Sequence, residues 1–253
     1  MATCSQRAVG APDDVRAALA DPGCLVPPVP ADGPAHTLAW LRAHVARFAN
    51  GAEHDRRRAI VEAELARIDP EDLRRAARDR TLGRPLAAPS APVAALAAAL
   101  GVGEAALDAV VADVAAVAAA YHPGTERDVE SADAAVERLV LAVGPPVSGE
   151  AAPNRVGLLV QACAATAALI EGAAALAPEL AGASVDAVVA ETLRRNPPAR
   201  TTRRLAAGGR ETLVLDLAAA GLPFGHGPRR CPGEGHARAL AAGALEAVLD
   251  PAR

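Results

Sequence analysis

The sequence predicts a mainly α-helical protein with a minor β part. Half of its 253 residues are hydrophobic but only 2% are aromatic, so alanine, leucine and valine must build the interior. That composition favours helices that pack closely through small side chains. Strand-like composition is confined to residues 201–217, which include the run "ETLVLDL". Because no internal repeat and no convincing linker interrupts the chain, we expect a single domain over residues 1–253.

The first half of the chain is a series of expected helices. Residues 13–21 resemble a short helix with Asp13 or Asp14 as its N-cap, ended by Pro22-Gly23. A proline-rich loop follows it, and residues 69–92 are polar without a clear period. The remaining helices of this half are expected at residues 36–50, 53–68, 93–100, 104–120 and 131–143.

The second half is expected to hold the longest helix and the strands. An apolar helix is predicted at residues 155–175, and a second helix at residues 185–195 is stopped by Pro197-Pro198. Short strands follow within residues 201–217. A glycine-rich loop and a last helix at residues 233–249 complete the chain.

Composition and charge also exclude several classes of protein. A formal net charge of −4 argues against general nucleic-acid binding, which needs an excess of basic surface. The start of the chain lacks the features of a signal peptide, and the apolar run 156–170 is too short to span a bilayer. The four cysteines are scattered, without a CxxC pair, which suits a reducing cytoplasm. We therefore expect a cytoplasmic protein with no membrane and no nucleic-acid partner.

Cys231 stands in the most distinctive stretch, "LPFGHGPRRCPGEGHARAL". Pro232 follows it at the expected start of the last helix, whose N–H groups and dipole would lower the pKa of the thiol. Arg229 and Arg230 add positive charge nearby, and the glycines would let a large flat ligand approach the backbone. A thiolate beside such a surface is suited to ligating heme iron.

The pattern Phe224-x-x-Gly227-x-x-x-Cys231-x-Gly233 resembles the heme-binding loop of the cytochrome P450 family at each defining position. The resemblance implies heme b (iron protoporphyrin IX), with Cys231 as axial iron ligand and Phe224 and Gly233 beside the cofactor. Two other interpretations are an ordinary buried thiol and a zinc site formed with His236. A zinc site would need a second ligand pair of the usual spacing, which the sequence lacks.

Four further positions are similar to the residues that hold the heme propionates in this family. They are His54 and Arg58, four residues apart in an expected helix, Arg204 after Pro197-Pro198, and Arg229 two residues before the cysteine. Arginine and histidine are suitable partners for carboxylates. The alternative for each is a solvated surface side chain.

Glu191 and Arg194 are similar to the E-x-x-R pair of the family, which implies a structural role for this pair on the side of the heme that carries the cysteine. Their spacing puts both on one helix face. The family's meander has no counterpart, because only "DLAAAG" separates the expected strand from Leu222. The chain therefore resembles an unusually short, trimmed member.

In the long apolar helix, Thr166 aligns with the family's catalytic threonine, and Ala165 stands where an acid is usual. The alternative for Thr166 is a hydroxyl satisfied by a carbonyl of its own helix.

The resemblance implies an oxidoreductase, a monooxygenase acting on a small organic substrate such as a secondary metabolite or xenobiotic. Its electrons would come from a ferredoxin or a flavin reductase. Two alternatives stay open because the acid and the meander are missing. One is a heme-binding homologue without turnover, such as a sensor or degenerate form, and the other is a peroxide-using variant.

Overall fold

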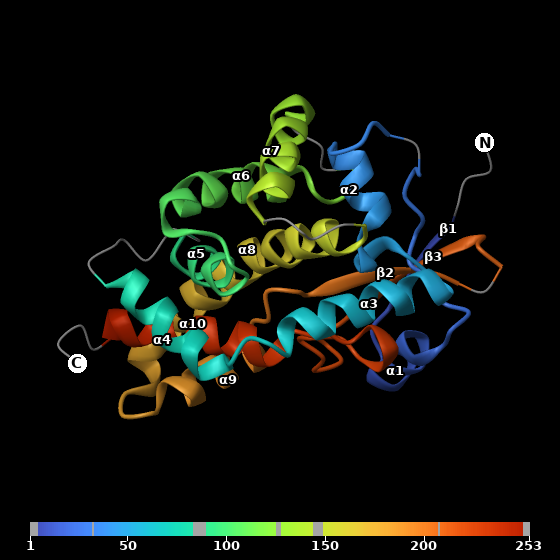
Figure 1. Ribbon diagram of the computed structural model, residues 1–253. Helices are drawn as coiled ribbons and strands as arrows, with labels where there is room; N and C mark the ends of the chain where they lie inside the picture. The colour runs from blue at the N-terminus through green and yellow to red at the C-terminus, as the bar shows by residue number, and fades with distance from the viewer. Residues whose placement is uncertain are drawn as a thin grey trace.

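The computed structural model describes residues 5–31, 33–82, 90–124, 128–143, 149–206 and 208–249. Within these ranges the chain is mainly helical, with a small sheet on one side (Figure 1). The predicted fold class is therefore confirmed.

The helices begin and end within a few residues of most of the expected positions. They are α1 (Pro12–Ala20), α2 (Leu38–His44), α3 (Gly51–Leu65), α4 (Pro70–Thr81), α5 (Ser90–Ala99), α6 (Leu107–Ala120), α7 (Val129–Ala142), α8 (Ala151–Leu176), α9 (Val185–Arg195) and α10 (Glu234–Leu249), with 3-10 turns η1 (Ala46–Phe48), η2 (Glu104–Ala106), η3 (Ala177–Leu180) and η4 (Gly227–Arg229).

Two helix starts differ from expectation. Helix α1 begins at Pro12 after Ala11, so Asp13 and Asp14 lie in its first turn and neither is the N-cap. Helix α4 was not expected, although the Asp69 carboxylate accepts from the Glu71 and Asp72 backbone N–H groups at 2.7 and 3.4 Å. Aspartate followed by proline at the first helical position is a favourable start.

The expected helix 36–50 is also shorter than predicted. Thr37 caps α2, its hydroxyl accepting from the Trp40 N–H at 3.2 Å, and the helix ends at His44. Val45 has φ −95° and ψ 152°, an extended conformation that interrupts the helix before η1. The Asn154 side chain accepts from the Ala46 N–H at 2.9 Å, so a tertiary contact stabilises the break.

The sheet has the strand order β1–β3–β2. Strands β2 (Thr201–Leu205) and β3 (Glu211–Asp216) are antiparallel and lie where strands were expected. Strand β1 (Ser5–Val9) was not expected, and it pairs in parallel with β3, with Ser5 opposite Glu211. Only Val9 of β1 is buried, so the strand carries little pattern of its own.

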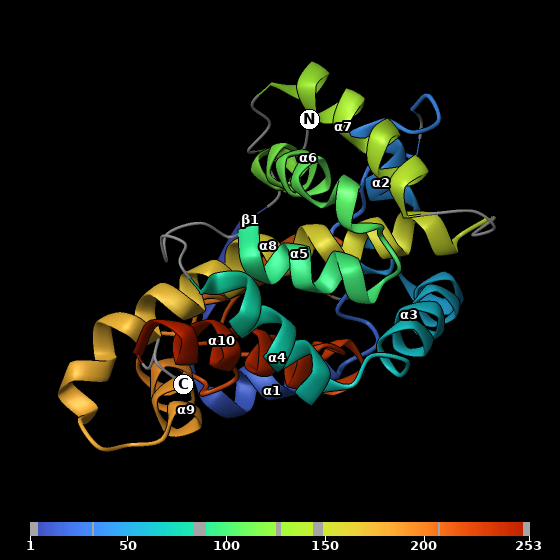
Figure 2. The ribbon, with the colours of Figure 1, turned by 60° about the vertical axis from the view of Figure 1, so that its left-hand side comes forward.

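Helix α8 runs through the middle of the molecule, between α6 and α7 on one side and α4 and α10 on the other (Figures 1 and 2). It contributes buried side chains to two hydrophobic clusters, with Leu159 in one and Ile170 in the other. The expectation that the apolar run is too short to span a bilayer concerned residues 156–170 alone. The longer segment Ala151–Leu180, which is α8 with η3, is long and apolar enough to cross a membrane by length and composition alone. Half of its most apolar window is buried against protein, as in the core helix of a domain.

Helices α4 and α10 make the closest helix contact. A Cβ at Gly243 of α10 would lie 2.9 Å from the Arg74 carbonyl carbon and closer still to its oxygen. The Arg74 side chain bonds Glu246 of α10 at 2.5 Å and Asp186 of α9 at 3.1 Å. A glycine and shared ion pairs therefore join α10 to its neighbours.

Candidate functional site

Cys231 lies at the end of a tight glycine loop that precedes α10. Its N–H donates to the Phe224 carbonyl at 2.8 Å, which closes the loop. Gly225 and Gly227 have φ of +74° and +67°, a region that side chains rarely adopt. A Cβ at Gly227 would also lie 3.0 Å from the Leu19 carbonyl oxygen of α1. The glycines are thus needed for the loop's shape and for its contact with α1.

The Cys231 side chain is exposed, but the surrounding protein desolvates the thiol and raises its pKa. The Gly233 N–H and the charges of Arg58 and Arg47 act in the opposite direction and are outweighed. This corrects the expectation that the helix N-terminus would lower the pKa. In the chain by itself the neutral thiol is favoured.

Asn50, which is not among the predicted site residues, links three segments of the site. Its side-chain amide donates to the Val26 carbonyl and accepts from the Val26 N–H, both at 2.9 Å. It also accepts from the Arg229 guanidinium at 2.9 Å, and its backbone begins α3. One side chain thus joins the segment after α1, the start of α3 and the cysteine loop.

Arg229 and Arg204 carry charge without a carboxylate partner among the described residues. Arg229 is half-buried, and besides Asn50 it donates to the Ala49 carbonyl at 2.5 Å. Arg204 is buried on β2 and bonds the Thr202 hydroxyl at 3.1 Å and the Arg203 carbonyl at 2.9 Å. Burial, then the charges of Arg229 and Arg47, lower the pKa of Arg204 to about 10. An uncompensated buried cation of this kind is costly.

Arg47 is the second residue that the sequence analysis missed. It lies in η1, exposed, with its guanidinium carbon 5.9 Å from the centre of the Phe48 ring. No carboxylate within the described ranges lies at ion-pair distance from it. Its charge acts on Arg204 and on the Cys231 thiol, so it belongs to the same site. Arg47, Arg204 and Arg229 are called the arginine cluster below.

His54 and Arg58 lie on α3 next to this cluster. His54 is buried, its Nδ1 is 3.0 Å from an Asp55 carboxylate oxygen, and burial lowers its pKa. Arg58 is mostly buried and pairs with Glu62 at 2.7 Å. The charges of Arg229 and Arg58 both act on His54. The fold thus brings the four predicted propionate residues and Cys231 into one electrostatic neighbourhood.

Glu191 and Arg194 form the expected ion pair, with two bonds of 2.6 Å. The pair lies at the surface, however, since the Arg194 side chain is 69% exposed. Arg195 shares the same carboxylate, and the hydrogen bonds of Arg194 and Arg195 lower the pKa of Glu191 to about 2. The pair therefore lies at the surface of α9, and its predicted structural role on the cysteine side of the heme stays a prediction.

Thr166 is buried on α8, on the face that also holds Cys163 and Ile170, while Ala165 is exposed. The helix is continuous past Cys163 from Ala151 to Leu176. It packs against α10, the helix that follows Cys231.

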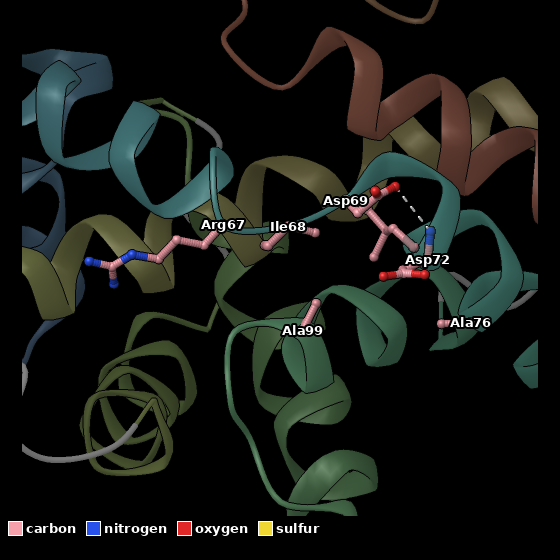
Figure 3. A pocket seen from close by; sticks show the side chains of 7 residues that line it. Arg67, Ile68, Asp69, Asp72, Ala76 and Ala99 are labelled. Carbon is pink, nitrogen blue, oxygen red and sulfur yellow. Dashed lines mark hydrogen bonds between the residues drawn. The ribbon is translucent and has the colours of Figure 1, made fainter.

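A separate shallow pocket of about 280 Å³ lies between the start of α4 and the end of α5 (Figure 3). Ile68 and Leu73 form its apolar part, and Arg67, Asp69 and Asp72 its polar part. Figure 3 shows the Asp69 carboxylate bonded at the first turn of α4, so this acid is occupied as a helix cap. None of the predicted site residues lines this pocket.

Comparison with known proteins identifies the architecture. No family model and no curated protein matches the chain. Solved structures do: P450BioI in complex with a hexadec-9Z-enoic acid-ligated acyl carrier protein has a TM-score of 0.75 at 18% identity, over 96% of this chain and 84% of that one. CYP154C4 from Streptomyces sp. ATCC 11861, bound to testosterone, has a TM-score of 0.68 at 21% identity, over 96% of this chain and 81% of that one.

A third match is CxnD, a cytochrome P450 enzyme for C–S bond formation in chuangxinmycin biosynthesis. Its TM-score is 0.70 at 18% identity, over 96% of this chain and 79% of that one. The chain has the cytochrome P450 fold, shortened to 253 residues.

Proposed function

We propose that the chain is a heme-thiolate protein in which Cys231 is the axial ligand of heme b. The observation that carries the proposal is the arginine cluster beside an exposed cysteine, within a cytochrome P450 fold. Buried Arg204 has no carboxylate among the described residues, and a bound dianionic group would compensate it. His54, Arg58, Arg204 and Arg229 would hold the two propionates.

Two other loop residues suit a flat apolar ligand. Phe224 is half-buried, with the Arg238 guanidinium 5.2 Å from its ring centre. A Cβ at Gly233 would lie 3.7 Å from the Leu65 side chain, which is an ordinary contact, so packing does not require a glycine here. The lack of a side chain would instead let a ligand approach the backbone. Glu191 and Arg194 are assigned a structural role at the surface of α9.

The proposed activity is monooxygenase-type oxidation of a small organic molecule, a secondary metabolite or xenobiotic, by one domain over residues 1–253 in the cytoplasm. A thiolate-ligated heme supplies oxygen chemistry, because the sulfur donates electron density that favours O–O cleavage. A ferredoxin or flavin reductase would supply electrons. The Thr166 hydroxyl is the catalytic group proposed on α8, where it would hold a proton donor in place.

A second candidate is heme binding without monooxygenase turnover, or oxidation driven by peroxide. The observation in its favour is Ala165, an exposed methyl group where the family has an acid. The short connection from Asp216 to Leu222 also leaves no room for the family's meander. Peroxide would deliver oxygen already reduced and would need neither the relay nor a redox partner.

The spectrum of the reduced, carbon monoxide-bound protein tests the proposal. A strongly red-shifted Soret band is expected for wild type and should be lost in Cys231→Ala. Cys163→Ala is the matched control, because Cys163 is buried in α8 and should leave the band unchanged. If the band persists in Cys231→Ala and disappears in Cys163→Ala, Cys231 is not the ligand.

A further inference from the structure

The turn η4 leads directly into Cys231, and it lies between two segments from the N-terminal part of the chain. At one end Gly227 touches α1, because a Cβ there would lie 3.0 Å from the Leu19 carbonyl oxygen. At the other end the Arg229 guanidinium donates to the side chain of Asn50, at the start of α3. The turn that precedes the cysteine is thus held from both sides.

Helix α1 is itself fixed against the connection that runs from β3 to the cysteine loop. Its side chains Val15 and Leu19 are buried in one hydrophobic cluster with Ala220 of this connection. The Arg16 guanidinium also donates to the Ala220 carbonyl at 3.4 Å. The close approach at Gly227 is to backbone atoms of α1, so a change of side-chain rotamer cannot relieve a clash there. Helix α1 can give way to the loop only by moving as a whole.

Asn50 fixes the other side of the turn through both polar atoms of its amide. Its Oδ1 accepts from the Arg229 guanidinium and from the Val26 N–H, and its Nδ2 donates to the Val26 carbonyl, each at 2.9 Å. Burial lowers the pKa of Arg229, and the charge of Asp55 opposes this effect. The Asp55 side chain is 77% exposed, so it contributes charge from the surface. The hydrogen bonds to Asn50 and Ala49 fix where the guanidinium lies.

Both contacts act on Cys231 through a short stretch of backbone. Gly227 and Arg229 lie four and two residues before the cysteine. The Arg230 N–H donates to the Gly227 carbonyl at 3.0 Å, and the Cys231 N–H donates to the Phe224 carbonyl at 2.8 Å. A displacement of η4 would therefore be passed on to the sulfur, and metal ligation tolerates errors in distance of only about 0.2 Å.

We propose that Leu19, through its backbone at the end of α1, and Asn50 are positioning residues that hold η4 so that the Cys231 sulfur can ligate heme iron. This inference rests on the proposed function, because it concerns the ligand of that heme. It gives a role in ligation to a helix and an amide that lie far from the cysteine in the sequence.

The contact with α1 is tested by the spectrum of the reduced, carbon monoxide-bound protein. Gly227→Ala should lower the ratio of the red-shifted Soret band to the unshifted band by about 10-fold, the size expected for an overpacked contact. Gly225→Ala is the matched control, because Gly225 has a similar φ of +74° but a Cβ there would be 4.0 Å from its nearest neighbours. Equal losses in the two variants would overturn the inference, because strain within the loop would then explain both.

The contact with Asn50 is tested by the same ratio of bands. Asn50→Leu should lower the ratio because it removes the acceptor of Arg229, and Asn50→Asp should restore most of it because it keeps that oxygen. Asn196→Leu is the matched control, since Asn196 at the end of α9 also accepts from an arginine, Arg200, at 2.9 Å. This variant should keep the wild-type ratio. A wild-type ratio in Asn50→Leu would contradict the inference.

Alkylation of Cys231 in the heme-free chain gives a second readout that does not need the cofactor. The surrounding protein raises the pKa of this thiol, so a loop that leaves its supports should react faster with iodoacetamide. Peptide mass spectrometry should show rates about 3-fold higher or more in Gly227→Ala and Asn50→Leu than in their controls, with circular dichroism reporting the fold.

The two readouts separate this inference from the proposed function. If heme loads normally and both variants keep wild-type spectra and alkylation rates, the inference is wrong while the proposed function stands. If wild type loads no thiolate-ligated heme, the proposed function itself fails, and the alkylation rates alone decide whether α1 and Asn50 hold the loop.

Discussion

Arg74 and Arg204 are two partly or fully buried arginines in opposite electrostatic situations. Arg74, at the contact of α4 with α10, donates to two carboxylates, and its hydrogen bond to Glu246 raises its pKa. Arg204, in the arginine cluster, has only neutral acceptors, and burial lowers its pKa to about 10. Arg74 is thus compensated within the chain, whereas Arg204 has no carboxylate partner among the described residues. Under the proposed function, an outside anion would compensate Arg204.

The largest effect is expected at the helix contact. Gly243→Ala would force a methyl group into the Arg74 carbonyl, so α10 must move away from α4, and we expect a loss of about 3 kcal/mol or more in the free energy of unfolding. Urea denaturation measures it.

Gly235→Ala is the matched control, because it lies in the same helix and a Cβ there would meet nothing within 4 Å. This change should be neutral or stabilising by up to about 1 kcal/mol. Equal losses in the two variants would mean that glycine content, and not the α4–α10 contact, decides stability.

The next largest effect is expected at Arg204, the buried arginine without a carboxylate partner among the described residues. Arg204→Met keeps much of the volume and removes an uncompensated buried charge, so we expect the heme-free protein to gain about 1 kcal/mol in stability. The same variant should load less heme, measured by heme titration. Arg74→Met should lose stability instead, because it leaves Glu246 without its partner. A stability loss in Arg204→Met would show that the cluster is compensated within the chain.

A smaller effect on the free energy of unfolding is expected when acid protonates His54, which lies next to the arginine cluster. Burial lowers the pKa of His54 below its unfolded value, so the unfolded chain binds the extra proton first. The free energy of unfolding should therefore fall as pH drops from 7 to 5, and His54→Gln should flatten part of that slope. His122→Gln is a useful comparison, because burial lowers the pKa of His122 in the same direction. An unchanged slope in His54→Gln would contradict the assignment.

The smallest effect is expected on α9. Glu191→Ala breaks an ion pair that solvent already screens, so folded yield and heme content should stay close to wild type. Circular dichroism melting and heme stoichiometry measure the two. A chain that no longer folds would show that the pair has a structural role despite its exposure.

Much of the fold could be predicted because helices carry a local signal. Helix α9 has the bounds expected from its periodicity and the two prolines that follow it, and α10 begins one residue from the expected start. The Asp69-Pro70 start also indicates helix α4. Most residues of this helix are polar, however, so its apolar face was not recognised in the sequence. Strand β1 carried almost none, since its pairing with β3 is set by a distant partner.

Part of the site could be predicted for the same reason, and part could not. The cysteine loop is a contiguous pattern, so its residues were found directly. Asn50 was not found, because its partners Val26 and Arg229 are far away in sequence. Arg47 could have been noticed only as an arginine without an acidic neighbour one helical turn away. Whether it is free of ion pairs depends on the fold.

The parallel pairing of β1 with β3 has a consequence for how the protein is made. Residues 5–9 are synthesised well before their hydrogen-bonding partners at 211–215, so this ladder closes a long loop. The cysteine loop contacts α1 through Gly227 and so waits for the same late segment. Helices that follow one another in the chain, such as α4 with α5, α5 with α6 and α6 with α7, contact each other and can assemble during synthesis. Under the proposed function, cofactor capture should therefore wait for residues 211–231, and a nascent chain stalled before residue 211 should contain folded helices and bind no heme.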